Sequence, residues 1–326
     1  MRNDLIKGYL GTYYSQESAG IYAFSFNRNT GSVSEPALWY GAPNSKYLSL
    51  RGGLLATPLT YGDRAGLRLL DTSDGAPMGS AFVEKQAACF VVQDEDRIYT
   101  ANYHEGSVII YNRRTFRIEK RIETGEGSGC HQILLHGRYV IAICLLRDEA
   151  LIFDRAAGYE EAGRIGFEKG TGPRHGVFDR EHKRLFIVSE LSNKLFVFKT
   201  VGDKGFEKAF ESDILKKGAI YETAPTSAAI RLAPDERYLY ISTRGADVIT
   251  AFRIKGNGAE MIQQVKSGGK HPRDIALSGD GRFILAVNRD EGGMVVFKRD
   301  GKSGLIGEKT AQADVAQAVS IVLDED

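Results

Sequence analysis

Side chains that bind anions or transfer protons recur in this sequence at two kinds of position, just before a short apolar segment and in the polar tip that follows one. Arginine guanidinium groups bind carboxylate and phosphate oxygens in bidentate fashion, and histidine changes its charge near neutral pH. Gathered at one place, such residues would bind a small anion and move protons on it. The residues concerned are Tyr103, His131, Arg174, His175, Glu190, Arg244, Arg273 and Arg289.

The segments that carry these residues share one pattern. Each has a short apolar strand, a polar turn rich in Asp and Gly, a second apolar strand, a polar tip, and a third strand of Val, Ile and Phe. Turn residues between β-branched and aromatic runs predict antiparallel meanders, and a period of roughly 40 to 50 residues in all-strand sequence predicts a β-propeller. The segments that follow the pattern are 47–72, 88–115, 130–155, 174–200, 228–254 and 273–299.

The two ends of the chain supply one further unit. Residues 5–34 lack the first strand of the pattern, whereas 316–326 look like an isolated first strand. We therefore expect residues 1–326 to form a single all-β domain, a seven-bladed β-propeller of four-stranded antiparallel blades closed by the C-terminal strand in the first blade. Because the strands alternate in direction, the start of each first strand and the tip between the second and third strands lie on one face, at the mouth of the central channel.

Several short motifs, taken in order, resemble those of the propeller-type lactonases, a family that includes one class of 6-phosphogluconolactonase and a fungal carboxy-muconate lactonizing enzyme. The motifs span the chain and are GTY at 11–13, the hairpin GIYAFSFNRNTGSVS at 20–34, NYHEGSV at 102–108, GPRH at 172–175, SEL at 189–191, STRG at 242–245 and HPRD at 271–274. The resemblance implies catalytic roles for His131, Arg174, Glu190 and Arg244.

The chain departs from the family in the fourth blade. Where relatives usually have two histidines separated by one residue, this sequence has Gly129, Cys130 and His131, and where they usually have an Asp-Leu-Gly tip it has Cys-Leu-Leu at 144–146. The fourth blade therefore contributes a less polar wall to the cavity, and the resemblance leaves the substrate open.

The residues and the resemblance together predict hydrolysis of a small anionic sugar lactone, with 6-phosphogluconolactone as the first candidate. Arg174 or Arg244 would stabilise the negative charge that develops on the ring carbonyl oxygen. His131 is favoured as the base because the ordinary pKa of histidine lies near 6.5. Glu190 would orient that histidine, pair with an arginine, or act as the base itself.

Further residues are expected to bind the substrate without taking part in the proton transfers. They are Tyr103, His175, Arg273 and Arg289. If the substrate carries a phosphate, Arg273 together with Lys270, His271 or Arg289 would contact it. Two other functions fit the same residues: cycloisomerisation of a carboxylated muconate, and a non-catalytic propeller that presents an exposed apolar patch to a protein partner.

Each candidate also has a purely structural interpretation. Arg174 and Arg273 would anchor loops by bonding backbone carbonyls, His131 would be a buried histidine with satisfied hydrogen bonds, and Glu190 would pair with an arginine. The other histidines, His104, His136, His182 and His271, are expected to be ordinary turn or surface residues.

Composition narrows the partners and cofactors. Lysine and arginine total 43 against 42 acidic residues, and no long uncharged apolar run occurs, so we expect neither nucleic acid nor membrane as a partner. Cys89, Cys130 and Cys144 lie far apart without CxxC spacing, which predicts free thiols in the cytoplasm. The glycines lie in hairpin turns, so no nucleotide cofactor is expected, and the histidines and acids lack zinc spacing, so no catalytic metal is expected.

Overall fold

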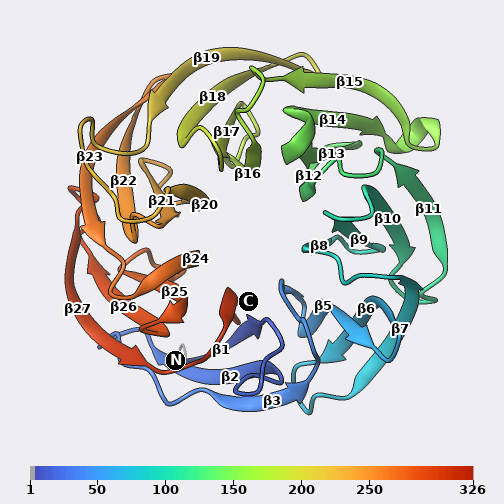
Figure 1. Cartoon of the computed structure of the whole chain (residues 1–326), viewed down its shortest axis with the longest axis horizontal. Helices are drawn as coiled ribbons and strands as arrows, with labels where there is room; N and C mark the ends of the chain where they lie inside the picture. Colours follow the sequence, from blue (N-terminus) through green and yellow to red (C-terminus); the bar gives the residue numbers. More distant parts are fainter. Residues whose placement is uncertain (1–3, 326) are drawn as a thin grey trace.

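The computed structural model describes residues 4–325. Seven four-stranded antiparallel sheets, the blades, stand around a central channel (Figure 1). The only helical segments in the described chain are two short 3₁₀ turns, η1 (Leu145–Arg147) and η2 (Arg155–Ala157). The expected seven-bladed all-β propeller is therefore confirmed.

Within each blade the strands follow one another from the channel outward. Blade 1 contains β28 (Ala318–Leu323), β1 (Leu5–Thr12), β2 (Gly20–Asn27) and β3 (Ala37–Gly41). Blade 2 contains β4 (Ser49–Arg51), β5 (Leu54–Tyr61), β6 (Arg64–Asp71) and β7 (Pro77–Glu84). Blade 3 contains β8 (Phe90–Gln93), β9 (Arg97–Asn102), β10 (Ser107–Asn112) and β11 (Ile118–Glu123).

The next four blades have the same order. Blade 4 contains β12 (Cys130–His136), β13 (Tyr139–Cys144), β14 (Glu149–Asp154) and β15 (Glu160–Gly166). Blade 5 contains β16 (Pro173–Phe178), β17 (Arg184–Ser189), β18 (Lys194–Val201) and β19 (Gly205–Asp213). Blade 6 contains β20 (Thr226–Leu232), β21 (Tyr238–Arg244), β22 (Val248–Lys255) and β23 (Gly258–Lys266). Blade 7 contains β24 (Lys270–Leu277), β25 (Phe283–Glu291), β26 (Met294–Arg299) and β27 (Ile306–Ala313).

Strand β28 closes the ring in the first blade, as the sequence predicts. It pairs antiparallel with β1, with Ile321 opposite Leu10. The backbone N–H of Ile321 also donates a hydrogen bond to Asp274 of blade 7 at 3.1 Å. The C-terminal strand thus links the last blade to the first.

The core lies between the blades rather than inside each one. In β17, Phe186 and Val188 pack toward blade 6, whereas Leu185 and Ile187, which alternate with them, pack toward blade 4. Successive residues of a strand point to opposite faces, so a strand that is apolar on both faces needs a neighbour on each side. This packing fixes the positions of the strand ends that form the mouth.

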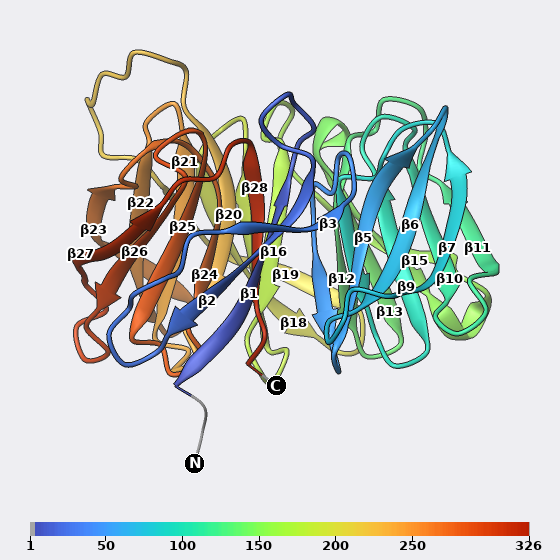
Figure 2. The same ribbon diagram turned by 90° about the horizontal axis from the view of Figure 1, so that it is seen from below.

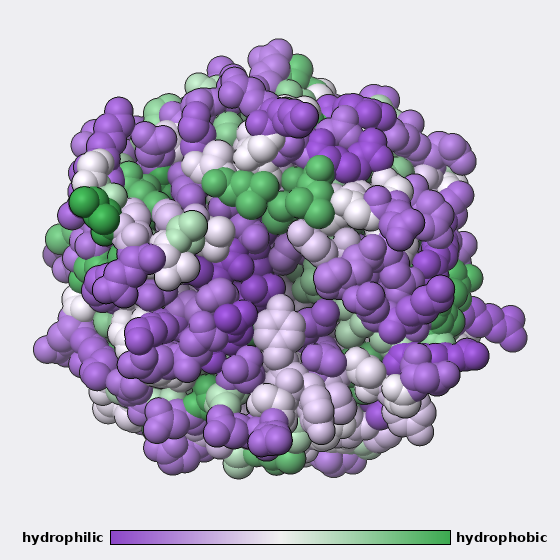
Figure 3. Space-filling model, in the orientation of Figure 1, coloured by the Kyte–Doolittle hydropathy of each residue, from purple (hydrophilic) through white to green (hydrophobic). Residues whose placement is uncertain are grey.

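The two faces of the ring carry different ends of the strands. Strand β1 begins and β28 ends on one face, and the first strands start on the other, from which the loop of residues 214–225 projects (Figure 2). The latter face is the mouth, and hydrophilic side chains gather on both sides of its hollowed centre, which a hydrophobic patch borders above (Figure 3). Within residues 4–325, no helix is long and apolar enough to cross a bilayer.

Candidate active site

A cavity of about 210 Å³ opens at the mouth of the channel. Its walls are formed by Tyr13, Lys46, Cys89, Tyr103, His104, His131, Glu190, Arg244 and Arg273. A narrow extension below it reaches Tyr47, Arg174, His175 and Val319. All the catalytic and substrate-binding residues predicted from the sequence therefore lie at this cavity or its extension, apart from Arg289.

Three of these residues stand at β-bulges in the first strand of a blade. In β16, Pro173 pairs with Ser189 and His175 pairs with Val188, so Arg174 is an extra residue opposite no partner. The same register shift occurs around His131 in β12 and around Arg273 in β24. A bulge re-aims the side chain of the extra residue, and in this way all three side chains turn into the channel.

Glycines make room for two of these bulges. Gly172 precedes β16 with a φ of +63°, and a Cβ there would lie 2.6 Å from Cγ of Leu191. Gly129 precedes β12 with a φ of +67°, and its Cβ would lie 2.8 Å from Cγ of Leu146. Both the left-handed backbone and the close approach require glycine.

Glu190 is held between two buried arginines. Its Oε2 accepts from Nε of Arg174 and from Nη2 of Arg244, each at 2.8 Å. Arg174 also donates to the backbone oxygen of Ala228, and Arg244 to that of Thr226. Although burial raises the pKa of Glu190, the charges of Arg174 and Arg244 hold it below its ordinary value. The carboxylate is therefore ionised at neutral pH.

His131 and His175 form a buried pair, with His131 in the cavity wall and His175 at the narrow extension. Nδ1 of His131 lies 3.1 Å from Nε2 of His175, and the side chains are 5% and 2% exposed. Burial first, and then the charge of Arg174, lower both pKa values well below 6.5, so both rings are neutral at neutral pH. Within residues 4–325, no group of three or more His, Cys, Asp or Glu side chains is placed to hold a metal ion.

Two cations at the cavity have no carboxylate partner in the described chain. They are Lys46 and Arg273, which lie 5.9 and 5.4 Å from the ring of Tyr13. Lys46 was missed in the sequence, although it directly precedes the blade 2 segment. Cys89, which stands just before β8, was also missed as part of the wall. Burial raises the pKa of the Cys89 thiol, which therefore stays protonated.

Arg289 lies outside the cavity wall. Its guanidinium group forms two hydrogen bonds to Asp290, at 2.6 and 3.1 Å. Lys270 pairs with Glu291, and Nδ1 of His271 lies 3.5 Å from Asp290. Of the groups predicted to contact a phosphate, only Arg273 is thus both at the cavity and free of an acidic partner among residues 4–325.

The expectation of three free thiols is wrong. Cys130 and Cys144 form a disulfide, and within the described chain only Cys89 is free. The two bonded residues face each other across the β12–β13 hairpin. Their pairing depends on strand register, so the absence of a CxxC motif did not exclude it. Cysteine usage therefore no longer favours a reducing compartment.

The chain matches known proteins over nearly its whole length. The family model "Lactonase, 7-bladed beta-propeller" matches residues 7–323. A 6-phosphogluconolactonase of Bacillus subtilis is 26% identical over 325 residues, covering 91% of this chain and 92% of its own, and an uncharacterised Staphylococcus saprophyticus protein is 29% identical over 331 residues, covering 92% and 93%. The structure of a periplasmic gluconolactonase of Pseudomonas aeruginosa superposes with a TM-score of 0.88 at 21% identity, covering 98% of this chain and 99% of that one.

Proposed function

The chain belongs to the seven-bladed β-propeller lactonase family, and on that premise we propose that its mouth cavity hydrolyses a small anionic sugar lactone. The observation that carries the proposal is the charge balance of the cavity. Lys46, Arg174, Arg244 and Arg273 face a single carboxylate, Glu190, while the neighbouring histidine pair is neutral. A bound anion would supply the missing negative charge.

The two unpaired cations indicate where that anion would bind. A buried or half-buried cation without a partner costs free energy, which a bound phosphate or carboxylate would offset. Lys46 and Arg273 flank Tyr13 on one side of the cavity. The first substrate to test is 6-phosphogluconolactone, because the Bacillus subtilis relative that matches 91% of this chain is named 6-phosphogluconolactonase.

Hydrolysis would use the remaining charges of the cavity. Water adds to the lactone carbonyl carbon, and negative charge develops on the carbonyl oxygen. Donors already fixed in place stabilise that charge without reorganising, and removing one such donor typically costs about 10²- to 10³-fold in kcat. Arg174 and Arg244, both held in place by Glu190, are fixed donors of this kind at the cavity and its extension.

Continuous proton release tests the proposal, because each lactone opened yields one acid. Freshly generated 6-phosphogluconolactone and unphosphorylated glucono-δ-lactone are each supplied to the wild type, with spontaneous hydrolysis subtracted. We expect saturable acceleration with the phosphorylated lactone and a loss of about 10²-fold or more in Glu190→Gln. No acceleration of either lactone would overturn the proposal.

A matched pair of arginine variants tests the anion site. Arg273→Ala is expected to raise KM for the phosphorylated lactone by about tenfold, since a charge-assisted hydrogen bond contributes about 1.5–3 kcal/mol. Arg289→Ala, whose charge is already paired with Asp290, should leave KM within about twofold on the same reasoning. Equal effects of the two variants would place the anion elsewhere.

A further inference from the structure

A chain of three side chains runs from a buried arginine to the cavity. Nη1 of Arg174 lies 3.5 Å from Nδ1 of His175, and Nε2 of His175 lies 3.1 Å from Nδ1 of His131. All three side chains are buried, and His131 alone of the three lines the open part of the cavity. From the interior outward, the order is therefore the Arg174 guanidinium group, the His175 ring, the His131 ring and the cavity.

The arginine favours one direction for the hydrogen bonds between these three side chains, against a contact of the His131 ring with its own backbone, which favours a protonated ring nitrogen there. A guanidinium group donates only and is never an acceptor, so Nδ1 of His175 must accept, and the single proton of that neutral ring is on Nε2. That N–H then donates to Nδ1 of His131. The proton of His131 is consequently on its own Nε2. In the other tautomer, the Nδ1–H of His175 would face an N–H of Arg174, and two donors cannot form a hydrogen bond with each other.

The surroundings keep the chain in this state. Burial and the charge of Arg174 lower the pKa of both histidines, so neither ring gains a second proton that would break the order. The bulge at Arg174 makes the arrangement possible, because it lets Arg174 and His175, which are consecutive in β16, both reach inward.

Nε2 of His131 is the free end of the chain. It has no side-chain partner among the described residues, and its ring lies edge-on to Tyr103 with the centroids 5.9 Å apart. Glu190 lines the same cavity. A substrate there would meet both an N–H group and an ionised carboxylate.

We infer that His175 is a positioning residue that fixes His131 as the Nε2–H tautomer, so that His131 presents a hydrogen-bond donor, not a base, to the lactone. This inference rests on the proposed function for the use made of the donor. The assignment differs from the sequence-based expectation, which gave the base to His131 and a substrate contact to His175. Arg174 then has two effects, because it orders the histidines and keeps Glu190 ionised.

The proton transfers balance with these roles. Glu190 accepts a proton from water as the water oxygen bonds to the carbonyl carbon, and the electron pair of the C=O double bond moves to the carbonyl oxygen, which accepts from Nε2–H of His131. When the carbonyl re-forms, the bond to the ring oxygen breaks, and that oxygen takes the proton from Glu190. The product is the open-chain hydroxy acid, and both side chains return to their starting states.

Long-range ¹H–¹⁵N correlation spectra of histidine-labelled wild type test the tautomer directly, with no substrate present. The protein has six histidines, and the signal lost in His131→Gln assigns His131. We expect a protonated Nε2 and an unprotonated Nδ1 on His131 between pH 7 and 8. A protonated Nδ1, or an even mixture of tautomers, would overturn the inference.

Two variants of His175 test its positioning role. His175→Gln keeps an amide N–H toward His131 and an oxygen toward Arg174, whereas His175→Leu removes both. We expect His175→Leu to lower kcat about 10²-fold with little change in KM, to lose the single tautomer of His131, and to be rescued at least about tenfold by the glutamine. Circular dichroism confirms that each variant is folded.

The outcomes separate this inference from the proposed function. An active wild type with the wrong tautomer, or equal kcat in the two His175 variants, would overturn the inference alone. A wild type with the expected tautomer but no lactonase activity would overturn the proposed function and with it the catalytic use of the donor.

Discussion

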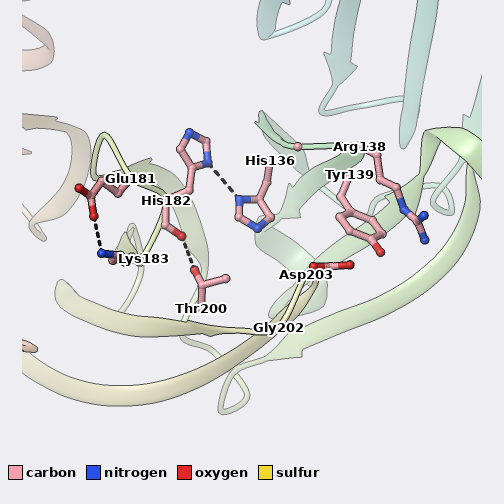
Figure 4. A pocket seen from close by; sticks show the side chains of 10 residues that line it. His136, Arg138, Tyr139, Glu181, His182, Lys183, Thr200, Gly202 and Asp203 are labelled. Carbon is pink, nitrogen blue, oxygen red and sulfur yellow. Dashed lines mark hydrogen bonds and ion pairs between the residues drawn. The ribbon is translucent and has the colours of Figure 1, made fainter.

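Two pairs of histidines join blade 4 to blade 5, one at each face of the propeller. At the mouth, Nδ1 of His131 lies 3.1 Å from Nε2 of His175. At the opposite end of β12, Nδ1 of His136 lies 3.0 Å from Nδ1 of His182, beside a cavity of about 500 Å³ (Figure 4). The two distances are similar, but the rings of the mouth pair lie edge to face at 69° whereas those of the other pair are stacked at 22°. The larger cavity accompanies the stacked pair.

The difference between the pairs lies in what surrounds them. Burial and arginine charges lower the pKa of His131 and His175 well below the ordinary value. At the opposite face, burial and His182 lower the pKa of His136, but Asp203 opposes them. A pair of histidines is therefore not a site in itself. Its protonation, and so its chemistry, is decided first by how deeply it is buried and then by the fixed charges that face it.

Removing the arginine of the mouth pair should have the largest effect. Arg174→Met leaves Glu190 with one arginine and His175 without its donor, so we expect a loss of about 3 kcal/mol in the free energy of unfolding and about 10³-fold in kcat. Denaturant unfolding and proton release measure the two effects.

The matched control is Arg138→Met at the opposite face. Arg138 pairs with Asp154 at 2.9 Å but is exposed, so the unfolding midpoint and kcat should not change measurably. Equal destabilisation by the two substitutions would contradict the difference in burial that distinguishes the two faces.

The pairs should also differ in how pH affects stability. The pKa values of His131 and His175 are depressed in the folded protein. Below pH 6.5 these two histidines therefore bind protons in the unfolded state but stay neutral in the folded state. Stability is therefore complete above that pH and falls as pH drops, by roughly 1.4 kcal/mol per pH unit for each histidine. Unfolding at pH 7.5 and 5.5 should show this slope reduced in the double variant His131→Gln/His175→Gln.

The corresponding double variant of the other pair, His136→Gln/His182→Gln, should reduce the slope less, because Asp203 partly offsets the shift at His136. An equal or larger reduction of the slope by this second variant would contradict the predicted difference between the two histidine pairs.

The sequence predicts the strands of this molecule but not their local irregularities. The period and turn residues predict the strands, and the missing strand of residues 5–34 predicts the closure by β28. Periodicity does not reveal the bulges at His131, Arg174 and Arg273, since an extra residue at a strand start looks like any strand residue. The pairing of histidines 44 positions apart depends on those bulges.

The other differences have similar causes. Lys46 was missed because it lies in the loop that precedes β4, whereas Arg174 lies within β16. The Cys130–Cys144 disulfide depends on the register of one hairpin, with a sequence separation of 14 and no motif. A pattern of residue types does not determine strand register or the backbone conformation of a single residue, so it cannot predict features that depend on them.

A smaller effect is expected from the glycines at the two ends of β12. Gly129, at the mouth end, has a φ of +67° and no room for a Cβ, whereas Gly137, at the other end, has a φ of +55° and open space. Gly137→Ala should cost about 1 kcal/mol of stability through backbone strain alone. Gly129→Ala should cost more and lower kcat by about tenfold, because it displaces His131. Thermal unfolding and initial rates compare them, and equal costs would contradict the crowding at Gly129.

One matched pair of substitutions, His131→Leu and His136→Leu, distinguishes the two histidine pairs when kcat/KM is measured with 6-phosphogluconolactone. Both remove one histidine of a pair from the same strand, and leucine leaves no N–H donor in its place. We expect a loss of about 10²- to 10³-fold in His131→Leu and a change within about twofold in His136→Leu. Wild-type kcat/KM in His131→Leu, or an equal loss in both variants, would contradict the assignment of the chemistry to the mouth.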